Sequence, residues 1–290
     1  ALATVLDTAG NNVQIWAREK EVVDSINNNH RNPSYLSDIR LPASIKAYDD
    51  LEHCLRDQDM ILFATPSHTL RELAAKIKPC LDGHEILVTV SKGIENNTGM
   101  RMSQVISETL HLSTEEIVIL SGPSHAEEVS KKYPTTIVAA CADIDHARDV
   151  QKLFSNDYFR VYSGNDIIGV EIGGAAKNII ALAAGICHGL GYGDNTMAAL
   201  VTRGLEEIIR LGTTLGAERA TFSGLSGMGD LIVTAFSSHS RNRQVGERIG
   251  KGEHLSDILA DMEMVAEGVE TTRSIKGLTQ KNNIVMPICE

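Results

Sequence analysis

Short apolar runs alternate with amphipathic segments over the first half of the chain. In the segments between the runs, apolar residues recur at the three- and four-residue spacing of a helix. Strands that are apolar throughout are buried on both faces, so the pattern predicts a doubly wound α/β domain with a parallel sheet between helices. The predicted strands are residues 13–16, 44–47, 60–64, 85–90, 117–120, 135–140 and 159–162. The predicted helices between them include residues 68–77, 102–110, 126–131 and 145–154.

Strand signals stop at about residue 163, and the remaining pattern is helical. No Pro- or Ser-rich linker separates the halves, so we expect a tight joint near residues 163–164 with a site in the crevice beside it. The sequence therefore predicts an α/β domain over residues 1–163 and an all-helical domain over residues 164–290. The predicted helices of the second half are residues 167–190, 195–215, 230–235, 242–250 and 255–261.

Composition is consistent with two ordinary soluble domains. A chain of 290 residues with 42% hydrophobic content can bury two cores. We find no run of the roughly 18 to 20 apolar residues that a membrane span needs, and no leader segment, so a cytoplasmic protein is expected. The net charge of -11 and the single Trp argue against nucleic-acid binding. An anionic ligand would have to be held by local cations.

The cysteines give no sign of a disulfide framework or of a metal site. They are scattered without a CxxC pair or a Cys/His cluster, and no metal is expected. Free thiols in a reducing compartment are the default for such a pattern. The five are Cys54, Cys80, Cys141, Cys187 and Cys289.

Lys177 is the only Lys, Arg, Asp or Glu between Glu171 and Asp194, in a long and otherwise apolar helical segment. No carboxylate stands three or four residues away to pair with it. This favours a chemical role in a packed helix, although a long stem that reaches the surface is the alternative. The small residues at 173–176 indicate clearance for a cofactor or a close helix contact.

Three turns that follow predicted strands carry small and hydroxylated residues, at 65–68, 91–93 and 121–126. In a doubly wound sheet, ligands bind outside the carboxyl ends of the strands, and helix N-termini there can face a phosphate. Lys92 is placed to meet an anionic or developing negative charge. Loops of this kind also favour Gly, Ser and Pro for structural reasons, and Lys92 could equally face solvent.

Arg18 follows an early predicted strand, where an acidic residue would bind a ribose 2'-hydroxyl and an arginine a 2'-phosphate. Its neighbour Glu19 blurs this reading. NADP is somewhat favoured over NAD, with an ordinary surface arginine as the alternative.

Two further polar groups precede helices in the second half. Asp230 ends a Gly-rich segment and could be a helix N-cap or a site residue. The loop at residues 237–243 holds hydroxyls, an amide and two guanidinium groups, which suit a phosphate or carboxylate but would also suit a solvated turn.

Taken together, these motifs resemble those of bacterial-type NAD(P)-dependent glycerol-3-phosphate dehydrogenases. They occur in the family's order and spacing along the whole chain, which makes the set specific although each motif alone is weak. The resemblance implies a Rossmann-like domain followed by a helical domain of the 6-phosphogluconate-dehydrogenase type. The matching motifs are SKGIE at 91–95, LSGPSHAEE at 120–128, VEIGGAAKN at 170–178, GMGDL at 227–231, SRNR at 240–243 and VAEG at 265–268.

The resemblance also implies an activity, hydride transfer between glycerol 3-phosphate or dihydroxyacetone phosphate and NAD or NADP, in a homodimer that supplies phospholipid synthesis. It implies Lys177 as general acid/base, with Lys92 and Asp230 beside it. The implied substrate residues are Lys92, Gly122, Ser124, Lys177, Asp230, Ser240, Arg241 and Asn242. The implied cofactor residues, together with Arg18 from the strand-end argument, are Lys92, Ala126, Arg241, Val265 and Glu267.

A lysine that exchanges a proton with the substrate should titrate near neutral pH. Burial and the charge of Lys92 would lower the pKa of Lys177, while Asp230 would raise it. We expect a net downward shift.

The chain departs from the family pattern at both ends. A G-x-G-x-x-G turn after the first strand is absent, and on the family pattern it would precede residue 1. The chain also stops earlier than the family's helical domain should. Two alternatives stay open: a related two-domain dehydrogenase acting on a hydroxy acid or a ketopantoate-like substrate, and a non-catalytic NAD(P)-binding regulator.

Overall fold

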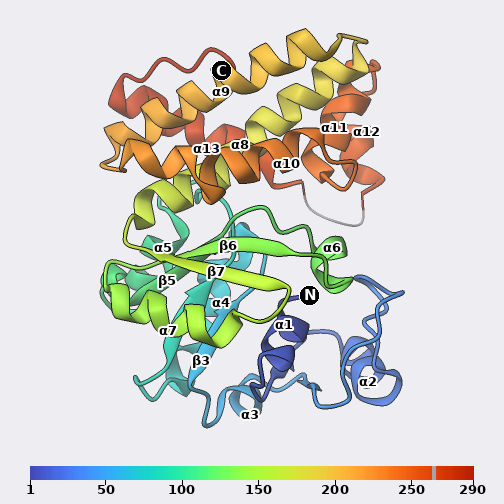
Figure 1. Cartoon of the computed structure of the whole chain (residues 1–290), viewed down its shortest axis with the longest axis vertical. Helices are drawn as coiled ribbons and strands as arrows, with labels where there is room; N and C mark the ends of the chain where they lie inside the picture. Colours follow the sequence, from blue (N-terminus) through green and yellow to red (C-terminus); the bar gives the residue numbers. More distant parts are fainter. Residues whose placement is uncertain (263–265) are drawn as a thin grey trace.

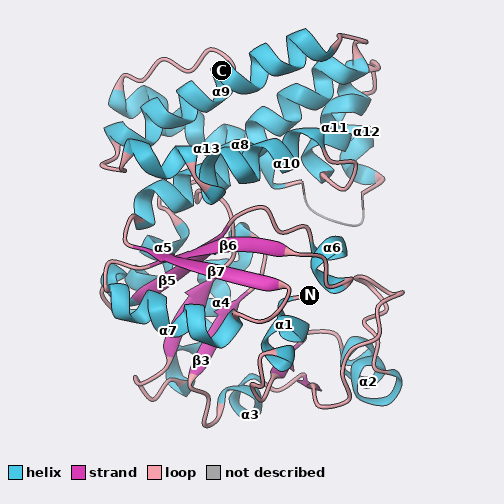
Figure 2. Ribbon diagram, viewed as in Figure 1, coloured by secondary structure: helices cyan, strands magenta, loops and turns pink. Residues whose placement is uncertain are grey.

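A sheet-containing half and an all-helical half are stacked along the long axis of the molecule (Figures 1 and 2). The structure is a computed structural model that describes residues 1–262 and 266–290. The last strand ends at Gly164 and the first long helix of the second half begins at Ile167, so the joint is short. Strands are confined to the first half of the described chain.

The strands form two separate sheets. Five strands are hydrogen-bonded in the order β3-β4-β5-β6-β7, and β1 pairs in parallel with β2 in a two-stranded sheet. A cavity of about 790 Å³ extends between β1 and β3. The bounds are β1 Gln14–Trp16, β2 Lys46–Tyr48, β3 Met60–Phe63, β4 Ile86–Thr89, β5 Ile117–Ser121, β6 Thr135–Ala140 and β7 Phe159–Gly164.

The larger sheet is mixed, which corrects the expectation of a parallel sheet throughout. Strands β3, β4 and β5 are parallel, whereas β6 runs antiparallel to β5 and parallel to β7. A helix that returns along a five-residue strand needs about 11 residues at 1.5 Å per residue. Helix α6 (Ala126–Ser130), between β5 and β6, has only five, whereas α7 (Ile144–Phe154), between β6 and β7, has 11. A parallel return is therefore made after β6 but not after β5.

Alternate residues of the central strands face two different cores, as the apolar runs predict. Val118 and Leu120 of β5 pack with α1 (Leu2–Thr8) and α7 on one face. Ile117 and Ile119 pack with α4 (Leu70–Ile77) and α5 (Met102–Leu110) on the other. Both faces of the sheet are therefore covered by helices, and the doubly wound α/β class is confirmed.

The helices of the first half lie close to their predicted positions. The predicted segment 68–77 is divided between a 3-10 turn, η1 (Ser67–Thr69), and helix α4. The helices are α1 Leu2–Thr8, α2 Lys20–Asn29, α3 Leu51–Leu55, α4 Leu70–Ile77, α5 Met102–Leu110, α6 and α7, with 3-10 turns η2 Lys78–Cys80 and η3 Thr114–Glu116.

The helical half contains one helix that the sequence pattern missed, α13 (Glu267–Asn282). Several of its buried positions carry hydroxyls, at Thr271, Ser274 and Thr279, so its buried face does not appear apolar in the sequence. The others are α8 Ile167–Gly189, α9 Asp194–Thr214, α10 Asp230–Phe236, α11 Arg241–Gly250 and α12 Leu255–Ala260, with the turns η4 Arg219–Ser223 and η5 Leu225–Gly229.

Helix α8 is the central helix of the second half and packs against α9, α10, α11 and α13. It is long and apolar enough to cross a membrane, so the statement that no such run exists is wrong for this segment. However, 83% of its most apolar window is buried inside the protein, as in a core helix. Where α8 crosses α11, glycines allow backbone contact: a Cβ on Gly246 would lie 2.0 Å from the carbonyl oxygen of Leu182.

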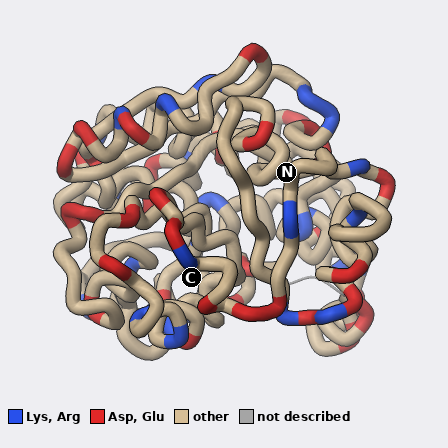
Figure 3. The backbone as a smooth tube through the Cα atoms, turned by 90° about the horizontal axis from the view of Figure 1, so that it is seen from below, with Lys and Arg blue, Asp and Glu red and all other residues tan. Residues whose placement is uncertain are grey.

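Charged residues are distributed over the backbone without a basic stripe among those drawn in Figure 3, where Lys and Arg are dispersed among Asp and Glu. All five cysteines are free, and Cys54, Cys141 and Cys289 are buried, which confirms the expectation of unpaired thiols.

Candidate active site

Two lysines from different halves of the molecule meet at the carboxylate of Asp230. Lys177 Nζ lies 2.5 Å from Oδ1, and Lys92 Nζ lies 2.6 Å from Oδ2. Lys177 comes from the middle of α8, Lys92 from the segment after β4, and Asp230 from the first turn of α10. The structure therefore brings together the three residues expected to be catalytic, in the crevice beside the joint between the halves.

Asp230 is not a helix N-cap, so that alternative is wrong. The preceding turn η5 is π-helical, and Gly229 occupies the cap position. A π-turn shifts the register of the residues that follow it and is frequent at functional sites. Here the carboxylate is turned into the interior, where Asp230 is 1% exposed.

Lys177 is 6% exposed, so its stem does not carry the ammonium to the surface. Nζ also donates to Thr234 Oγ1 at 2.8 Å. Burial lowers the pKa of Lys177 to about 8; the negative charge of Asp230 opposes this shift and the positive charge of Lys92 adds to it. The expected net downward shift is confirmed in direction, with burial as its largest cause.

The small residues before Lys177 serve close contacts of the helix. A Cβ on Gly173 would lie 2.6 Å from the backbone oxygen of Ser226, and one on Gly174 would lie 2.9 Å from Ser121 Oγ. Of the two explanations offered for residues 173–176, a close contact therefore applies to Gly173, where α8 meets η5.

Lys92 lies in a segment that is fixed on several sides. The neighbouring Ser91 donates through Oγ to the carbonyl oxygen of Thr65 at 2.5 Å. A Cβ on Gly93 would lie 2.7 Å from Ser67, so this position requires the close approach that glycine permits. Lys92 Nζ also reaches the carbonyl oxygen of Gly122 at 3.5 Å. Lys92 is therefore directed into the crevice rather than into solvent.

The turn after β5 passes close to the neighbouring strand. Gly122 has a φ of 145°, and a Cβ there would lie 2.9 Å from Cα of Ile137, so the conformation requires glycine. Ser124 Oγ donates to the carbonyl oxygen of Gly122 at 3.0 Å. Ala126 begins α6 and, with Ser124 and Lys92, lines the cavity described above.

The N-terminus of α11 carries the polar group at residues 240–242. Ser240 is the N-cap and accepts from the backbone N–H of Arg243. Asn242 Oδ1 accepts from the backbone N–H of Gly268 at 2.9 Å, which joins α11 to the start of α13. Arg241 is the first residue of the helix, where backbone N–H groups and the helix dipole favour an anion.

Glu267 begins α13 and joins the two halves by accepting from the backbone N–H of Ser67 at 3.2 Å. Burial raises the pKa of its carboxyl, and the bond from Ser67 and the positive charge of Arg241 oppose that shift. Val265, also expected at the cofactor, lies outside the described residues.

Arg18 lies apart from the lysine cluster. It follows β1, its side chain is exposed, and its guanidinium pairs with Glu19.

The cavity reaches the carboxyl ends of β1, β3 and β5, where a doubly wound sheet binds a dinucleotide. Its lining there includes Trp16, Thr65, Ser121 and Ser124. The hydroxyls of Thr65 and Ser121 are buried without a hydrogen-bond partner, and such groups can be satisfied by a polar ligand. These polar groups at the strand ends therefore fit a nicotinamide dinucleotide.

Sequence reasoning missed two residues of this site. Thr234, which holds Lys177, lies four residues after Asp230 on the same helix, a spacing that could have identified it. The second residue is His125. Burial lowers the pKa of its imidazole, and the positive charge of the nearby Lys177 lowers it further. Its ring is 6.0 Å from that of His239, which comes from the loop before α11. Both histidines lie in segments that the sequence singled out, at 121–126 and 237–243, but neither was named as a site residue.

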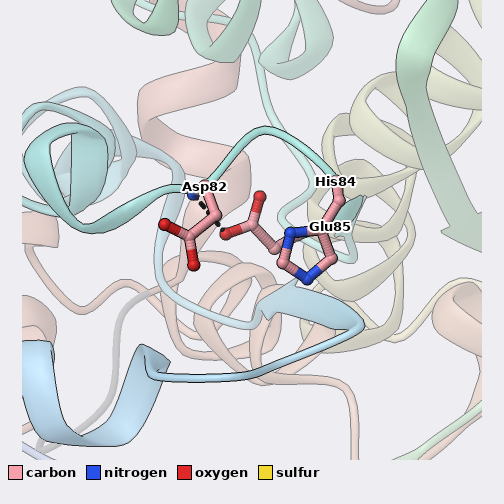
Figure 4. A group of neighbouring side chains, drawn as sticks. All are labelled: Asp82, His84 and Glu85. Carbon is pink, nitrogen blue, oxygen red and sulfur yellow. Dashed lines mark hydrogen bonds between the residues drawn. The ribbon is translucent and has the colours of Figure 1, made fainter.

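One group of possible metal ligands lies elsewhere, at Asp82, His84 and Glu85 before β4 (Figure 4). The two oxygens of Glu85 accept from the backbone N–H groups of Asp82 and Gly83 at 2.8 Å. This carboxylate stabilises a turn, and nothing further indicates an ion there.

Comparisons with known proteins agree with this geometry. Residues 1–147 match the N-terminal part of the NAD-dependent glycerol-3-phosphate dehydrogenase family, and residues 166–290 match its C-terminal part. The chain is 49% identical over 290 residues to the glycerol-3-phosphate dehydrogenase (NAD(P)+) of Clostridium botulinum (strain Alaska E43 / Type E3), covering 100% of this chain and 87% of that one. It is 50% identical over 291 residues to the enzyme of the same name from Bacillus subtilis (strain 168), covering 84% of that protein.

A solved structure shows the same fold. The crystal structure of glycerol-3-phosphate dehydrogenase from Coxiella burnetii matches with a TM-score of 0.93 at 34% identity, covering 99% of this chain and 88% of that chain. Sequence matches in both halves, high identity to named relatives and a shared fold lead to one conclusion. The chain belongs to the NAD-dependent glycerol-3-phosphate dehydrogenase family.

Proposed function

We propose that the chain interconverts sn-glycerol 3-phosphate and dihydroxyacetone phosphate, with Lys177 as the general acid/base. The observation that carries the proposal is a buried lysine whose pKa is lowered to about 8, held by Asp230 in the crevice beside the strand ends. A general acid/base works best when its pKa is close to the working pH.

The proton and the hydride are delivered by different partners. The nicotinamide cofactor, when bound, donates or accepts the hydride at C2 of the substrate. In the direction of reduction, Lys177 gives its proton to the carbonyl oxygen as C2 receives the hydride, and in oxidation it takes the hydroxyl proton back. Lys92 stabilises the negative charge that develops on that oxygen. Asp230 orients both ammonium groups.

The phosphate end of the substrate is assigned to the N-terminus of α11. Ser240, Arg241 and Asn242 offer a hydroxyl, a guanidinium and an amide there, and a guanidinium can bind phosphate through two parallel hydrogen bonds. Gly122 and Ser124 are assigned to the substrate on the opposite side, next to Lys92. This arrangement favours a phosphorylated substrate over a hydroxy acid or a ketopantoate-like compound.

The cofactor is NAD or NADP, and its contacts are assigned to Arg18, Lys92, Ala126, Arg241, Val265 and Glu267. Arg18 supports NADPH, because an exposed guanidinium after β1 can bind a 2'-phosphate. Glu19, which pairs with it, weakens that preference. A homodimer in the cytoplasm that supplies glycerol 3-phosphate for phospholipid synthesis completes the proposal and rests on the family resemblance.

Initial rates with three ketones test the substrate assignment. We expect dihydroxyacetone phosphate to be reduced with a kcat/KM about 100-fold or more above those of dihydroxyacetone and ketopantoate, since neither brings a phosphate monoester to the N-terminus of α11: dihydroxyacetone has no anionic group and ketopantoate has only a carboxylate. Comparable rates with ketopantoate would favour the related dehydrogenase. Tight cofactor binding without turnover of any ketone would favour a non-catalytic regulator.

The same assay with NADH and NADPH tests the role of Arg18. Arg18→Ala should raise the KM for NADPH and leave that for NADH unchanged. An unchanged KM for both cofactors would show that Arg18 is an ordinary surface residue.

A further inference from the structure

A buried ion pair next to the segment that carries Lys92 joins the two halves of the molecule. Arg101, the N-cap residue of α5, pairs through Nη1 with Oε2 of Glu171 on α8. The same carboxylate accepts from the backbone N–H and the Oγ of Ser103, both at 2.7 Å. The side chains of Arg101 and Glu171 are 14% and 4% exposed. Glu171 thus has three donors, all from the sheet domain.

These donors belong to the segment that carries Lys92. Arg101 forms a β-bridge with Ile94, two residues after Lys92. The backbone N–H of Glu95 donates to the carbonyl oxygen of Met100 at 2.9 Å, which closes the loop between them. A displacement of Arg101 would therefore also displace Lys92, because only a few hydrogen-bonded residues connect them.

Glu171 lies on the same helix as Lys177, six residues earlier, which corresponds to about 9 Å along the axis. Between them, Gly174 lies against the stem of Lys92, with 3.7 Å between Cδ of Lys92 and the position that a Cβ would take. Glu171, Lys92 and Gly174 also line one small cavity. The ion pair therefore fixes α8 against the Lys92 segment at the point where the two lysines approach each other.

We propose that Glu171 is a positioning residue that, through Arg101 and Ser103, holds Lys92 at its distance from Asp230 and Lys177. The proposal rests on the catalytic roles assigned above to the two lysines. It adds a residue that touches neither substrate nor cofactor. A buried carboxylate with three donors is a stiff connection, because breaking any one bond leaves a polar group unsatisfied.

Glu171→Gln tests this, with Glu207→Gln as a matched control. Glu207 is also a buried carboxylate, 4% exposed, and accepts from the backbone N–H groups of Ile288 and Cys289, away from the crevice. Both substitutions should lower the melting temperature. Only Glu171→Gln should lower kcat, by about 10- to 100-fold, because displacing a catalytic group by about 1 Å has effects of this size.

A pH profile separates positioning from stability. The charged and titratable groups that act on Lys177 are Asp230 and Lys92, with His125 and Glu267 also in range. The charge of Lys92 lowers the pKa of Lys177, so displacing Lys92 should move the midpoint of the oxidation profile to higher pH. Glu207→Gln should leave that midpoint unchanged.

A double variant shows whether Glu171 acts through Lys92. If it does, Glu171→Gln should shift neither kcat nor the pH midpoint any further in a Lys92→Met background. If Glu171→Gln does not fold, Arg101→Lys replaces it, because a lysine keeps the charge but lacks the guanidinium geometry. The expected shift is in the same direction and smaller.

The proposal would be overturned if Glu171→Gln, or Arg101→Lys where it replaces that variant, kept the wild-type kcat and pH midpoint. It would also be overturned if the loss of kcat were no larger than in Glu207→Gln. A third contrary result would be effects on kcat of Glu171→Gln and Lys92→Met that are fully additive in the double variant. Failure of the proposed function can be told apart from failure of the positioning role. It would appear as normal turnover in Lys177→Met, independently of the kcat of Glu171→Gln.

Discussion

Lys177 of α8 and Asp230 of α10 form an ion pair of 2.5 Å in which both side chains are almost completely buried. Burial and Lys92 lower the pKa of the lysine, and the carboxylate raises it. Burial and the charge of Lys92 outweigh the carboxylate, so the pKa of Lys177 falls to about 8, and a change to any of these partners should move it in a definite direction.

Removing the charge of Asp230 should lower the pKa of Lys177 further. In Asp230→Asn, burial and the charge of Lys92 act without opposition, so a smaller fraction of Lys177 is protonated at pH 7.5. Reduction needs the protonated form of Lys177, so the rate of reduction should begin to decrease at a lower pH than in the wild type. At pH 7.5 we expect kcat to be reduced by about 100-fold or more. Cofactor binding, followed by fluorescence, serves as the folding control. A midpoint that stays in place or moves to higher pH would refute this account of the pKa.

Arg241→Lys should weaken substrate binding more than turnover. A lysine retains the charge at the start of α11 but cannot form two parallel hydrogen bonds to a phosphate. We expect the KM for dihydroxyacetone phosphate to rise about 10- to 100-fold, with a smaller change in kcat. Arg219→Lys is the control, because Arg219 is an exposed residue paired with Glu206. Equal KM values for the two variants would show that Arg241 does not bind the phosphate.

Gly246→Ala should destabilise the helical half. The new Cβ would lie 2.0 Å from the carbonyl oxygen of Leu182, so α8 and α11 would have to separate, at a cost of about 1–3 kcal/mol in the free energy of unfolding. Gly277→Ala on α13 is the matched control, because a Cβ there meets nothing within 4 Å. That change should stabilise the helix by about 0.5–1 kcal/mol. Urea unfolding of both variants measures the difference, and a stable Gly246→Ala would contradict the close contact.

Much of the fold could be predicted from the sequence because apolar strands and amphipathic helices have distinct periods. The direction of β6 could not, since an apolar run does not specify the direction of its strand. Helix α13 was missed because its buried hydroxyls bond within the protein; Ser274 Oγ, for example, donates to the carbonyl oxygen of Ile94 at 2.9 Å.

The site was predictable where its residues lie in recognisable motifs. Lys177 stood out by its isolation in an apolar helix and Lys92 by its position after a predicted strand, and the family resemblance decided for Asp230 between a cap and a site residue. The pairing of Glu171 with Arg101 was not predictable, because only the fold brings together residues 70 positions apart. The inward orientation of the Asp230 side chain depends on the π-helical turn before it. The Gly-rich sequence of that turn is equally compatible with a conformation in which Asp230 would be an ordinary N-cap.

The most direct test of the central claim compares the wild type with Lys177→Met in both directions over pH 6 to 10. With its pKa lowered to about 8, Lys177 is protonated below that pH, so wild-type reduction should fall and oxidation should rise as pH increases through about 8. Lys177→Met should lose about 100- to 10,000-fold in kcat and both of these limbs, while still binding cofactor. Near-normal turnover with an unchanged pH profile would contradict the assignment of Lys177 as the general acid/base.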